Sequence, residues 1–573
     1  MLARDCLKAP LRSLFALSLL LAGAVAAQQR PDADAIASAH PLATAAGMLI
    51  LQQGGNAFDA AVAVSAALAV VEPYGSGLGG GGFWLLHRAR DGHQVMVDGR
   101  ERAPLAATPE MYLDADGEVI PGASINGPLA AGIPGVPAAL AHIARRYGRL
   151  SLEVSLGPAI ILARDGFPVD PVYRRLAGFR LDALRDSPSA AQQFLHGGEV
   201  PPLGHRIRQP DLAETLGSIA RDGAASFYRG DLARRLVDAV RAAGGIWSAR
   251  DLAAYRVIER RPVVTHFGDQ RVVSAALPSS GGVVLAQMLN MLDARRASTP
   301  DQIRDQIERV HLLVEIMRRA YADRARYLGD SDYVAVPLGR LLSRGYARRL
   351  ARQIDAQEAT PSSGIASDQR GRNTTHFSII DREGNRVAAT LSINYPFGSG
   401  FVAEGSGVLL NDEMDDFSAK PGVANAYGLV GNAANAIAPG KRMLSSMSPT
   451  FVESADRVLV LGTPGGSRII TMVWLAMLDA MEGTPVTEWV ARGRFHHQYL
   501  PDRIEVEPGA LPDTVIAGLQ RKGHEIRRLN DSYGNMQAVV WDRKNARLNA
   551  ASDPRGIGHS VVHARAEHAP GQR

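Results

Sequence analysis

The chain has 573 residues, of which 46% are hydrophobic and 21% are charged. This balance is ordinary for a globular protein and excludes a fibrous or largely disordered chain. The formal net charge is +5 at pH 7, an excess too small in a chain of this length to favour a nucleic acid or an anionic membrane surface as a partner.

The N-terminal residues have the three parts of a secretory signal. Three basic residues among the first twelve precede an apolar run, Leu14–Leu21, and small residues follow it. We expect residues 1–27 to be a signal peptide cut after Ala26 or Ala27, and the protein to be periplasmic or secreted. Cys6 is the only cysteine, so the mature chain would lack disulfides, thiol catalysis and thiolate metal sites. No other apolar run is long enough to span a membrane.

The segment from Asn56 to Glu72 is rich in Ala, Val and Leu and predicts a buried helix, capped by Asn56 with Asp59 three residues on. A glycine-rich run, residues 75–82, follows and contains a formal G-x-G-x-x-G match. A dinucleotide fingerprint follows a strand and opens a helix, whereas here a helix comes first and a predicted strand, residues 83–86, comes after. Close backbone packing explains these glycines better.

Residues 95–102 predict a strand that ends near Arg100, a side chain that is ordinarily solvated unless a carboxylate ligand needs a two-pronged partner. Residues 302–328 predict a long amphipathic helix from their apolar spacing of three and four. His376, His496 and His497 lack metal-ligand spacing and are interpreted as core or loop histidines. The sequence therefore predicts neither a metal nor a cofactor.

Two alternating runs on either side of a turn at residues 382–385 predict a β-hairpin, and a polar, exposed loop precedes it. Thr374 thus lies where a loop becomes a strand. If the bond between Asn373 and Thr374 is cut, the freed α-amine, with a pKa of roughly 7.7–8, can take the proton of the Thr374 hydroxyl. Two other readings are a glycosylation acceptor at Asn373-Thr374-Thr375 and a threonine that merely favours a strand.

The hairpin register decides what faces Thr374. Residues opposed across the two strands lie on one face. A register whose opposed numbers sum to 768 would place Thr374 opposite Asn394 and diagonal to Ser392.

Several motifs typical of a functional site follow the hairpin. An acidic cluster at residues 411–417 follows an apolar run, and a loop at 420–428 carries Tyr427. A predicted strand at 458–461 then opens into glycines and an apolar helix, an order typical of an anion-binding nest. The backbone N–H groups of Gly465 and Gly466 can hold an oxyanion there.

Four motifs in this order resemble the γ-glutamyltranspeptidase (glutathione hydrolase) family: Thr374–Ser378, Asn411–Gly422, Ser445–Pro449 and Pro464–Arg468. The resemblance covers essentially the whole mature chain. It implies an α/β (α+β) fold, the four-layer αββα sandwich of N-terminal nucleophile hydrolases. It also implies a precursor that cuts itself between Asn373 and Thr374 into a heterodimer, with a large subunit of residues 28–373 and a small catalytic subunit of residues 374–573.

The resemblance further implies that Thr374 attacks the γ-carbonyl of glutathione or another γ-glutamyl compound, and that water, an amino acid or a dipeptide releases the γ-glutamyl group. The remaining roles are carried over by position: Ser392 to hydrogen-bond the nucleophile, Gly465 and Gly466 for the oxyanion, Arg100, Ser445 and Ser446 for the α-carboxylate, Asn394, Glu413 and Asp416 for the α-amine, and Tyr427 on a lid. Ser392 stands where many members carry threonine, and it keeps the hydroxyl.

Two other functions compete with this one. The first is a relative specialised as a glutaryl or cephalosporin-type acylase, whose substrate lacks the α-amine. Such an enzyme would not need Asn394, Glu413 and Asp416 together, since buried polar groups discriminate against a substrate that lacks their partner. The second is an exported binding protein that has kept the fold and lost the chemistry, which predicts one uncut chain.

Overall fold

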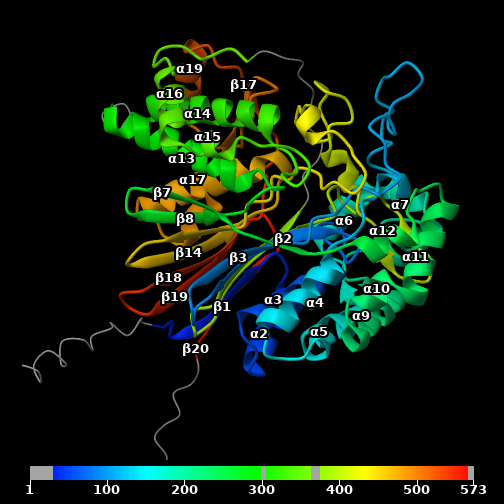
Figure 1. Cartoon of the computed structure of the whole chain (residues 1–573). Helices are drawn as coiled ribbons and strands as arrows, with labels where there is room; N and C mark the ends of the chain where they lie inside the picture. Colours follow the sequence, from blue (N-terminus) through cyan, green and yellow to red (C-terminus); the bar gives the residue numbers. More distant parts are fainter. Residues whose placement is uncertain (1–29, 299–304, 363–373, 565–573) are drawn as a thin grey trace, which may run out of the picture.

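A computed structural model describes residues 30–298, 305–362 and 374–564 (Figure 1). The predicted signal peptide, residues 1–27, and Asn373 of the predicted cleavage site lie outside these ranges. None of the helices within them is both long and apolar enough to cross a membrane.

Two antiparallel sheets form the centre of the molecule. The first sheet has seven strands, in the spatial order β20 (His559–Ala564), β1 (Ala33–Ser38), β9 (Thr375–Ile380), β10 (Arg386–Ser392), β2 (Gly81–Arg88), β3 (His93–Asp98) and β6 (Ile258–Arg260). The second has six, in the order β19 (Arg547–Ser552), β18 (Gln537–Asp542), β14 (Arg457–Gly462), β13 (Thr450–Glu453), β8 (Gln270–Ser274) and β7 (Val263–Phe267). Both sheets mix strands that precede residue 373 with strands that follow it.

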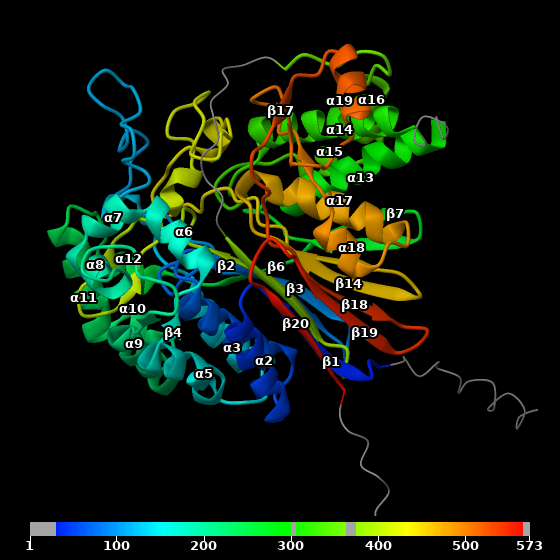
Figure 2. The ribbon, with the colours of Figure 1, turned by 180° about the vertical axis from the view of Figure 1, so that it is seen from behind.

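The two sheets face each other, with β9 against β14 and β18, and helices cover both outer faces (Figures 1 and 2). The first sheet is covered by α2 (Pro41–Gln52), α3 (Ala57–Val71), α4 (Val136–Tyr147) and α5 (Leu152–Asp165). The second is covered by α13 (Gly281–Ser298), α17 (Ile469–Met481) and α18 (Val486–Ala491), and the helices α14 (Gln306–Tyr327), α16 (Arg344–Arg352) and α19 (Asp513–Arg521) pack outside them. The predicted four-layer αββα fold is confirmed.

The remaining elements pack around these layers. Further helices are α6 (Pro171–Phe179), α7 (Leu181–Arg185), α8 (Pro188–Phe194), α9 (Pro210–Asp222), α10 (Ala225–Tyr228), α11 (Gly230–Ala242), α12 (Ala249–Ala254) and α15 (Leu338–Leu341). Short strands pair as β4 (Phe167–Pro168) with β5 (Arg206–Ile207), β11 (Val402–Ala403) with β12 (Val408–Leu409), and β15 (Phe495–His496) with β16 (Ile504–Val506) and β17 (Ile526–Arg528).

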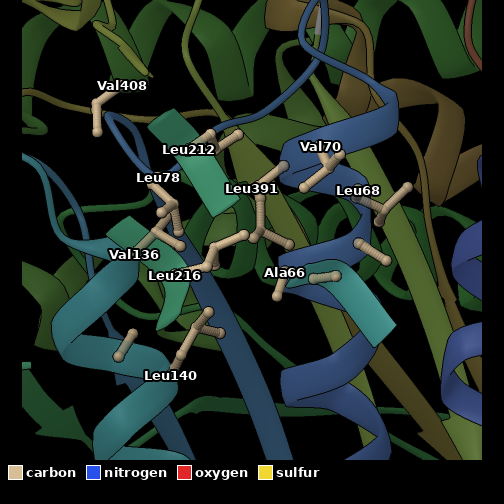
Figure 3. Packing of buried hydrophobic residues seen from close by; sticks show 14 of the residues in the cluster. Ala66, Leu68, Val70, Leu78, Val136, Leu140, Leu212, Leu216, Leu391 and Val408 are labelled. Carbon is tan, nitrogen blue, oxygen red and sulfur yellow. The ribbon is translucent and has the colours of Figure 1, made fainter. Parts of the chain in front are cut away.

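The alternation of side chains along the strands produces two separate cores. On β2, Phe83 and Leu85 face the second sheet, while Trp84 and Leu86 face the helices. Figure 3 shows the helix side, where Leu391 of β10 lies among apolar side chains from α3, α4 and α9. Because both faces of the first sheet are covered, its central strands are buried throughout.

The buried helix predicted from Asn56 to Glu72 is α3. Asn56 accepts the N–H groups of Phe58 and Asp59, and the Asp59 carboxylate accepts the N–H of Asn56, so a capping box starts the helix. The glycines that follow allow close backbone approach, as predicted, because a Cβ on Gly80 would overlap the carbonyl oxygen of Ser392.

The hairpin of β9 and β10 forms as predicted, but its register differs by two residues from the one considered above. Ile380 lies opposite Arg386 and Thr375 lies opposite Leu391, so Thr374 continues the ladder opposite Ser392 rather than opposite Asn394. An even shift keeps the same faces together.

Candidate active site

Thr374 lies at the end of the first sheet where several chain segments meet, and it is 8% exposed. Ser392 at the end of β10 lies opposite Gly81 at the start of β2, and Gly82 exchanges backbone hydrogen bonds with Gly99 just beyond β3. Arg100 therefore comes to the same end of the sheet as Thr374. The strand predicted for residues 95–102 ends earlier, at Asp98, because the Asp98 carboxylate accepts the N–H of Arg100 and turns the chain.

The second sheet brings its loops to the same end. On β9, His376 faces β14, and a Cβ on Gly462 would overlap its imidazole ring, so the glycine lets the two sheets approach. The loop after β14 carries Gly465 and Gly466, and the segment before β13 carries Ser445 and Ser446. The predicted site residues except Gly465 line one cavity of about 20 Å³: Arg100, Thr374, Ser392, Asn394, Glu413, Asp416, Tyr427, Ser445, Ser446 and Gly466. Gly465 lines a neighbouring cavity with Thr374.

Arg100 is buried and holds two of the predicted acidic residues. Its Nη1 donates to Glu413 Oε2 at 2.5 Å and its Nη2 donates to Asp416, while its Nε donates to the Met443 carbonyl at 3.3 Å. The acidic cluster forms a short, largely buried 3₁₀ helix, Glu413–Asp416, rather than a solvated turn. The predicted carboxylate-binding cation and ammonium-binding anions are thus in direct contact.

Burial raises the pKa of two carboxyl groups near Arg100. It raises the pKa of Glu413 to about 7, although Arg100 opposes the rise. Burial, with Glu413 nearby, also raises the pKa of Glu101 well above its usual range, and no atom of the described residues hydrogen-bonds the Glu101 carboxylate. Arg100 Nη1 also lies 3.5 Å from Glu101 Oε2, so a single guanidinium faces three buried or partly buried carboxyl groups.

Ser445 and Ser446 reach the cavity beside a cation that the sequence analysis missed. Arg324 of α14 donates to Ser446 Oγ at 3.0 Å and to Ser280 Oγ at 2.9 Å, while Ser445 Oγ accepts the Met447 N–H. Arg324 is buried, and its burial lowers its pKa. Its place on the apolar stripe of α14, three residues after Tyr321, was the signal available in the sequence.

Asn394 and Ser392 are held by backbone contacts. Asn394 adopts a φ of 73°, its side chain donates to the Asp412 carbonyl at 3.0 Å, and its N–H donates to Ser392 Oγ at 2.8 Å. The amide nitrogen of the Asn394 side chain is therefore held by Asp412, while the residue lines the same cavity as Glu413 and Asp416.

Gly465 and Gly466 adopt φ values of 142° and 57°, a region that L side chains rarely occupy. A Cβ on Gly466 would overlap the ring of Tyr427, and Tyr427 Oη donates to the Asn394 carbonyl at 2.7 Å. Tyr427 therefore packs directly against Gly466 in the cavity that Thr374 lines.

The three predicted core histidines are buried and hydrogen-bonded. The contacts are His376 with Thr390, His496 with Thr471, and His497 with Asp502. Across the described ranges, no three His, Cys, Asp or Glu side chains are grouped so as to hold a metal ion.

Glu72 is a second group that the sequence analysis missed. It lies at the end of α3, where its carboxylate accepts the Thr375 hydroxyl at 2.6 Å, directly beside the predicted nucleophile. Burial raises the pKa of Glu72 to about 8 despite the opposing bond from Thr375.

The pKa of Glu72 predicts a pH-dependent stability. The folded protein keeps this carboxyl protonated up to pH about 8, whereas the unfolded chain loses the proton near its ordinary pKa of 4.5. The Glu72 contribution to stability therefore falls by a few kcal/mol as pH rises from about 4.5 to 8. Relative to the parent protein, Glu72→Gln should show a Tm difference that grows in its favour from pH 5 to 8. The surface variant Glu110→Gln should follow the parent throughout, and a pH-independent difference for Glu72→Gln would contradict the assignment.

Comparison with known proteins places this site in a family. A sequence model described as gamma-glutamyltranspeptidase matches residues 43–563. The chain belongs to the gamma-glutamyltranspeptidase family. It is 41% identical over 532 residues to a glutathione hydrolase proenzyme of Escherichia coli K12, covering 91% of this chain and 90% of the relative. It is 43% identical over 513 residues to a protein of the same name from Pseudomonas sp. strain A14, covering 87% and 88%.

A solved relative shows that the family also contains acylases. A cephalosporin acylase from Bacillus halodurans superposes with a TM-score of 0.82 at 28% identity, covering 94% of this chain and 97% of the acylase. Membership of the gamma-glutamyltranspeptidase family thus agrees with the four-layer fold and leaves the substrate to be argued from the residues of the site.

Proposed function

We propose that the protein is a γ-glutamyltransferase and glutathione hydrolase with Thr374 as its nucleophile. One observation carries the proposal: a buried guanidinium, Arg100, lies in contact with two carboxylates, Glu413 and Asp416, in the cavity that Thr374 lines. A γ-glutamyl group ends in a free amino-acid head that carries one charge of each sign. A pocket with both a cation and anions complements that head, whereas a glutaryl group offers no ammonium.

Binding of the head requires a rearrangement of the closed cavity. Its volume of about 20 Å³ is close to what a single water needs. We propose that Tyr427 moves off Gly466 as a lid, and that Arg100 exchanges one carboxylate for that of the substrate, with Ser445 and Ser446 adding hydroxyl donors. Asn394, Glu413 and Asp416 then face the ammonium.

The chemistry begins with cleavage between Asn373 and Thr374, giving a large subunit, residues 28–373, and a small one, residues 374–573. The freed α-amine of Thr374 takes the proton from its own Oγ as Oγ attacks the γ-carbonyl. The N–H groups of Gly465 and Gly466 stabilise the oxyanion, and Ser392 hydrogen-bonds the nucleophile. The departing amine accepts the proton, which leaves a γ-glutamyl ester on Thr374. This reaction uses only groups of the protein and needs no cofactor.

Water, or the amine of an amino acid or dipeptide, then attacks the γ-carbonyl of the ester, which breaks the bond to Thr374 Oγ and releases glutamate or the γ-glutamyl product. We propose that the protein does this after export to the periplasm or secretion, as a heterodimer of its two fragments. Nucleic acid and membrane have no part in the reaction.

A two-substrate assay tests the proposal. On a denaturing gel the mature protein should give two bands, with the shorter fragment beginning Thr-Thr-His-Phe. It should release the anilide from γ-glutamyl-p-nitroanilide at least about 30 times faster than from the glutaryl analogue, because removal of one partner of a buried charged contact typically costs about 2–5 kcal/mol. Added glycylglycine should yield γ-glutamyl-glycylglycine.

The competing functions give different results in the same assay. A faster reaction with the glutaryl anilide would favour the acylase, and a single uncut band with no activity would favour a binding protein. Free glutamate as the only product in the presence of glycylglycine would contradict transfer.

A further inference from the structure

A second cavity, of about 460 Å³, adjoins the nucleophile. Thr374 lines both this cavity and the small closed one, and Gly465 lines the larger one as well. A ligand in the large cavity can therefore reach the reacting carbon without passing through the pocket that holds Arg100. Its volume lies in the range typical of small-molecule sites.

Two of the arginines that line this cavity already bind carboxylates of the protein. Arg468 donates to Glu505 through Nε at 3.0 Å and through Nη2 at 2.5 Å. Arg555 donates to Glu507 at 2.8 Å and to Asp553 at 3.0 Å. Both guanidinium groups are therefore held in place by carboxylates of the protein, although Glu505 also faces Arg503 at 3.6 Å and Arg527 at 3.7 Å.

Arg175 differs from these two. It lies on α6, where Val172, Arg175 and Leu176 share the face that lines the cavity. Its side chain is exposed and has no hydrogen bond or ion pair with any described residue. The nearby acidic residue at the start of α6, Asp170, caps the N–H groups of Val172 and Tyr173 through Oδ1, and its Oδ2 lies 4.0 Å from His40 Nε2 rather than in an ion pair with Arg175.

The cavity lining also carries a residue of the contrary charge. Asp531 is exposed and likewise makes no ion pair within the described ranges. A carboxylate that enters the cavity is repelled by Asp531 and attracted by Arg175, so its position is biased toward α6. Arginine suits this role because its planar fork matches the two oxygens of a carboxylate.

We infer that the large cavity is the subsite for the leaving group and the acceptor, and that Arg175 binds the terminal carboxylate of the dipeptide there. This inference rests on the proposed function. It names Arg175 as a residue that determines specificity for carboxylate-bearing acceptors, outside the pocket that binds the glutamyl head.

The transfer step balances within this arrangement. The acceptor amine forms a new C–N bond to the γ-carbon of the ester, and the bond from that carbon to Thr374 Oγ breaks. The Thr374 α-amine takes the proton lost by the acceptor nitrogen and returns it to Oγ. The products are the γ-glutamyl dipeptide and the restored threonine, and no other reactant is needed.

Arg175→Gln tests the inference, with Arg174→Gln as the matched control, because Arg174 is the neighbouring exposed arginine on α6 and does not line the cavity. The donor is γ-glutamyl-p-nitroanilide, whose leaving group has no carboxylate, and the acceptors are glycylglycine and glycylglycinamide. For Arg175→Gln the KM for glycylglycine should rise about tenfold, as expected for loss of a charge-assisted two-pronged contact. The KM for glycylglycinamide and hydrolysis of the donor alone should change less than about twofold.

A charge reversal, Arg175→Glu, should raise the KM for glycylglycine further and leave the amide acceptor unaffected. Equal changes for both acceptors, or the same change in Arg174→Gln, would overturn the inference. Failure of the proposed function is distinguishable, because the parent protein would then release no anilide from the γ-glutamyl donor at all.

Discussion

Thr374→Ala should give a single uncut chain with no measurable activity on γ-glutamyl-p-nitroanilide. The variant lacks the hydroxyl that we propose both cuts the precursor and attacks the substrate, and loss of a catalytic nucleophile lowers kcat by at least about 10⁴-fold. A denaturing gel, N-terminal sequencing and the anilide assay measure these effects. The fold should persist, since Thr374 ends a ladder that β9 and β10 complete without it.

Thr374→Ser is the matched control for this substitution. It retains a hydroxyl and, once cut, an α-amine on the same residue, so it should produce two fragments and keep measurable activity. Two normal fragments from Thr374→Ala, with the shorter one beginning at residue 374, would refute the assignment of the nucleophile.

Asp416→Asn should lower kcat/KM for γ-glutamyl-p-nitroanilide by about 10²- to 10³-fold and change the rate with the glutaryl anilide by less than about threefold. The substitution keeps the shape of the side chain and removes the charge that we propose to face the ammonium, and loss of one partner of a buried charged contact costs about 2–5 kcal/mol. The Asp416 side chain is 14% exposed, so the loss should lie below the upper end of that range. Arg100 keeps its contact with Glu413, so its guanidinium is not left unpaired.

Asp415→Asn is the control for Asp416→Asn. Asp415 is a buried carboxylate next in sequence that accepts from Ser124 and from the Ala426 N–H and does not line the cavity of Thr374. It should affect both anilides alike. Equal losses with Asp416→Asn would contradict an ammonium-binding role for Asp416.

Local patterns in the sequence predicted the elements that hold the site. The apolar run with its Asn56 cap predicted α3, and alternation around a turn predicted β9 and β10, because burial of one face and capping are local physical demands. The layered fold came from the family resemblance. The ends of elements were less predictable. β3 ends at Asp98 because the Asp98 carboxylate accepts the Arg100 N–H. The alternation of apolar and polar residues does not reveal such a bond between a side chain and the backbone.

The strand register and the long-range side-chain contacts could not be predicted from the sequence. Alternation decides which residues share a face of the sheet, so the sequence placed Thr374 and Ser392 on the same face. The turn decides which residues lie opposite each other, and the register that we considered differs from the observed one by two residues. Arg324 and Glu72 belong to helices predicted only as packing elements. Their partners, Ser446 and Thr375, are more than 100 residues away, and a contact at that separation depends on the assembled fold.

Each sheet contains strands from both sides of the proposed cut between residues 373 and 374. In the first sheet, β1 and β2 come from the first fragment, while β20, β9 and β10 come from the second. Three strand ladders, β20–β1, β1–β9 and β10–β2, and a fourth between β13 and β8, would then join the fragments. Exchange of a fragment between two molecules would break all four ladders and therefore requires global unfolding. When isotopically heavy and light preparations are mixed in native buffer, we expect no heterodimer that combines a heavy fragment with a light one.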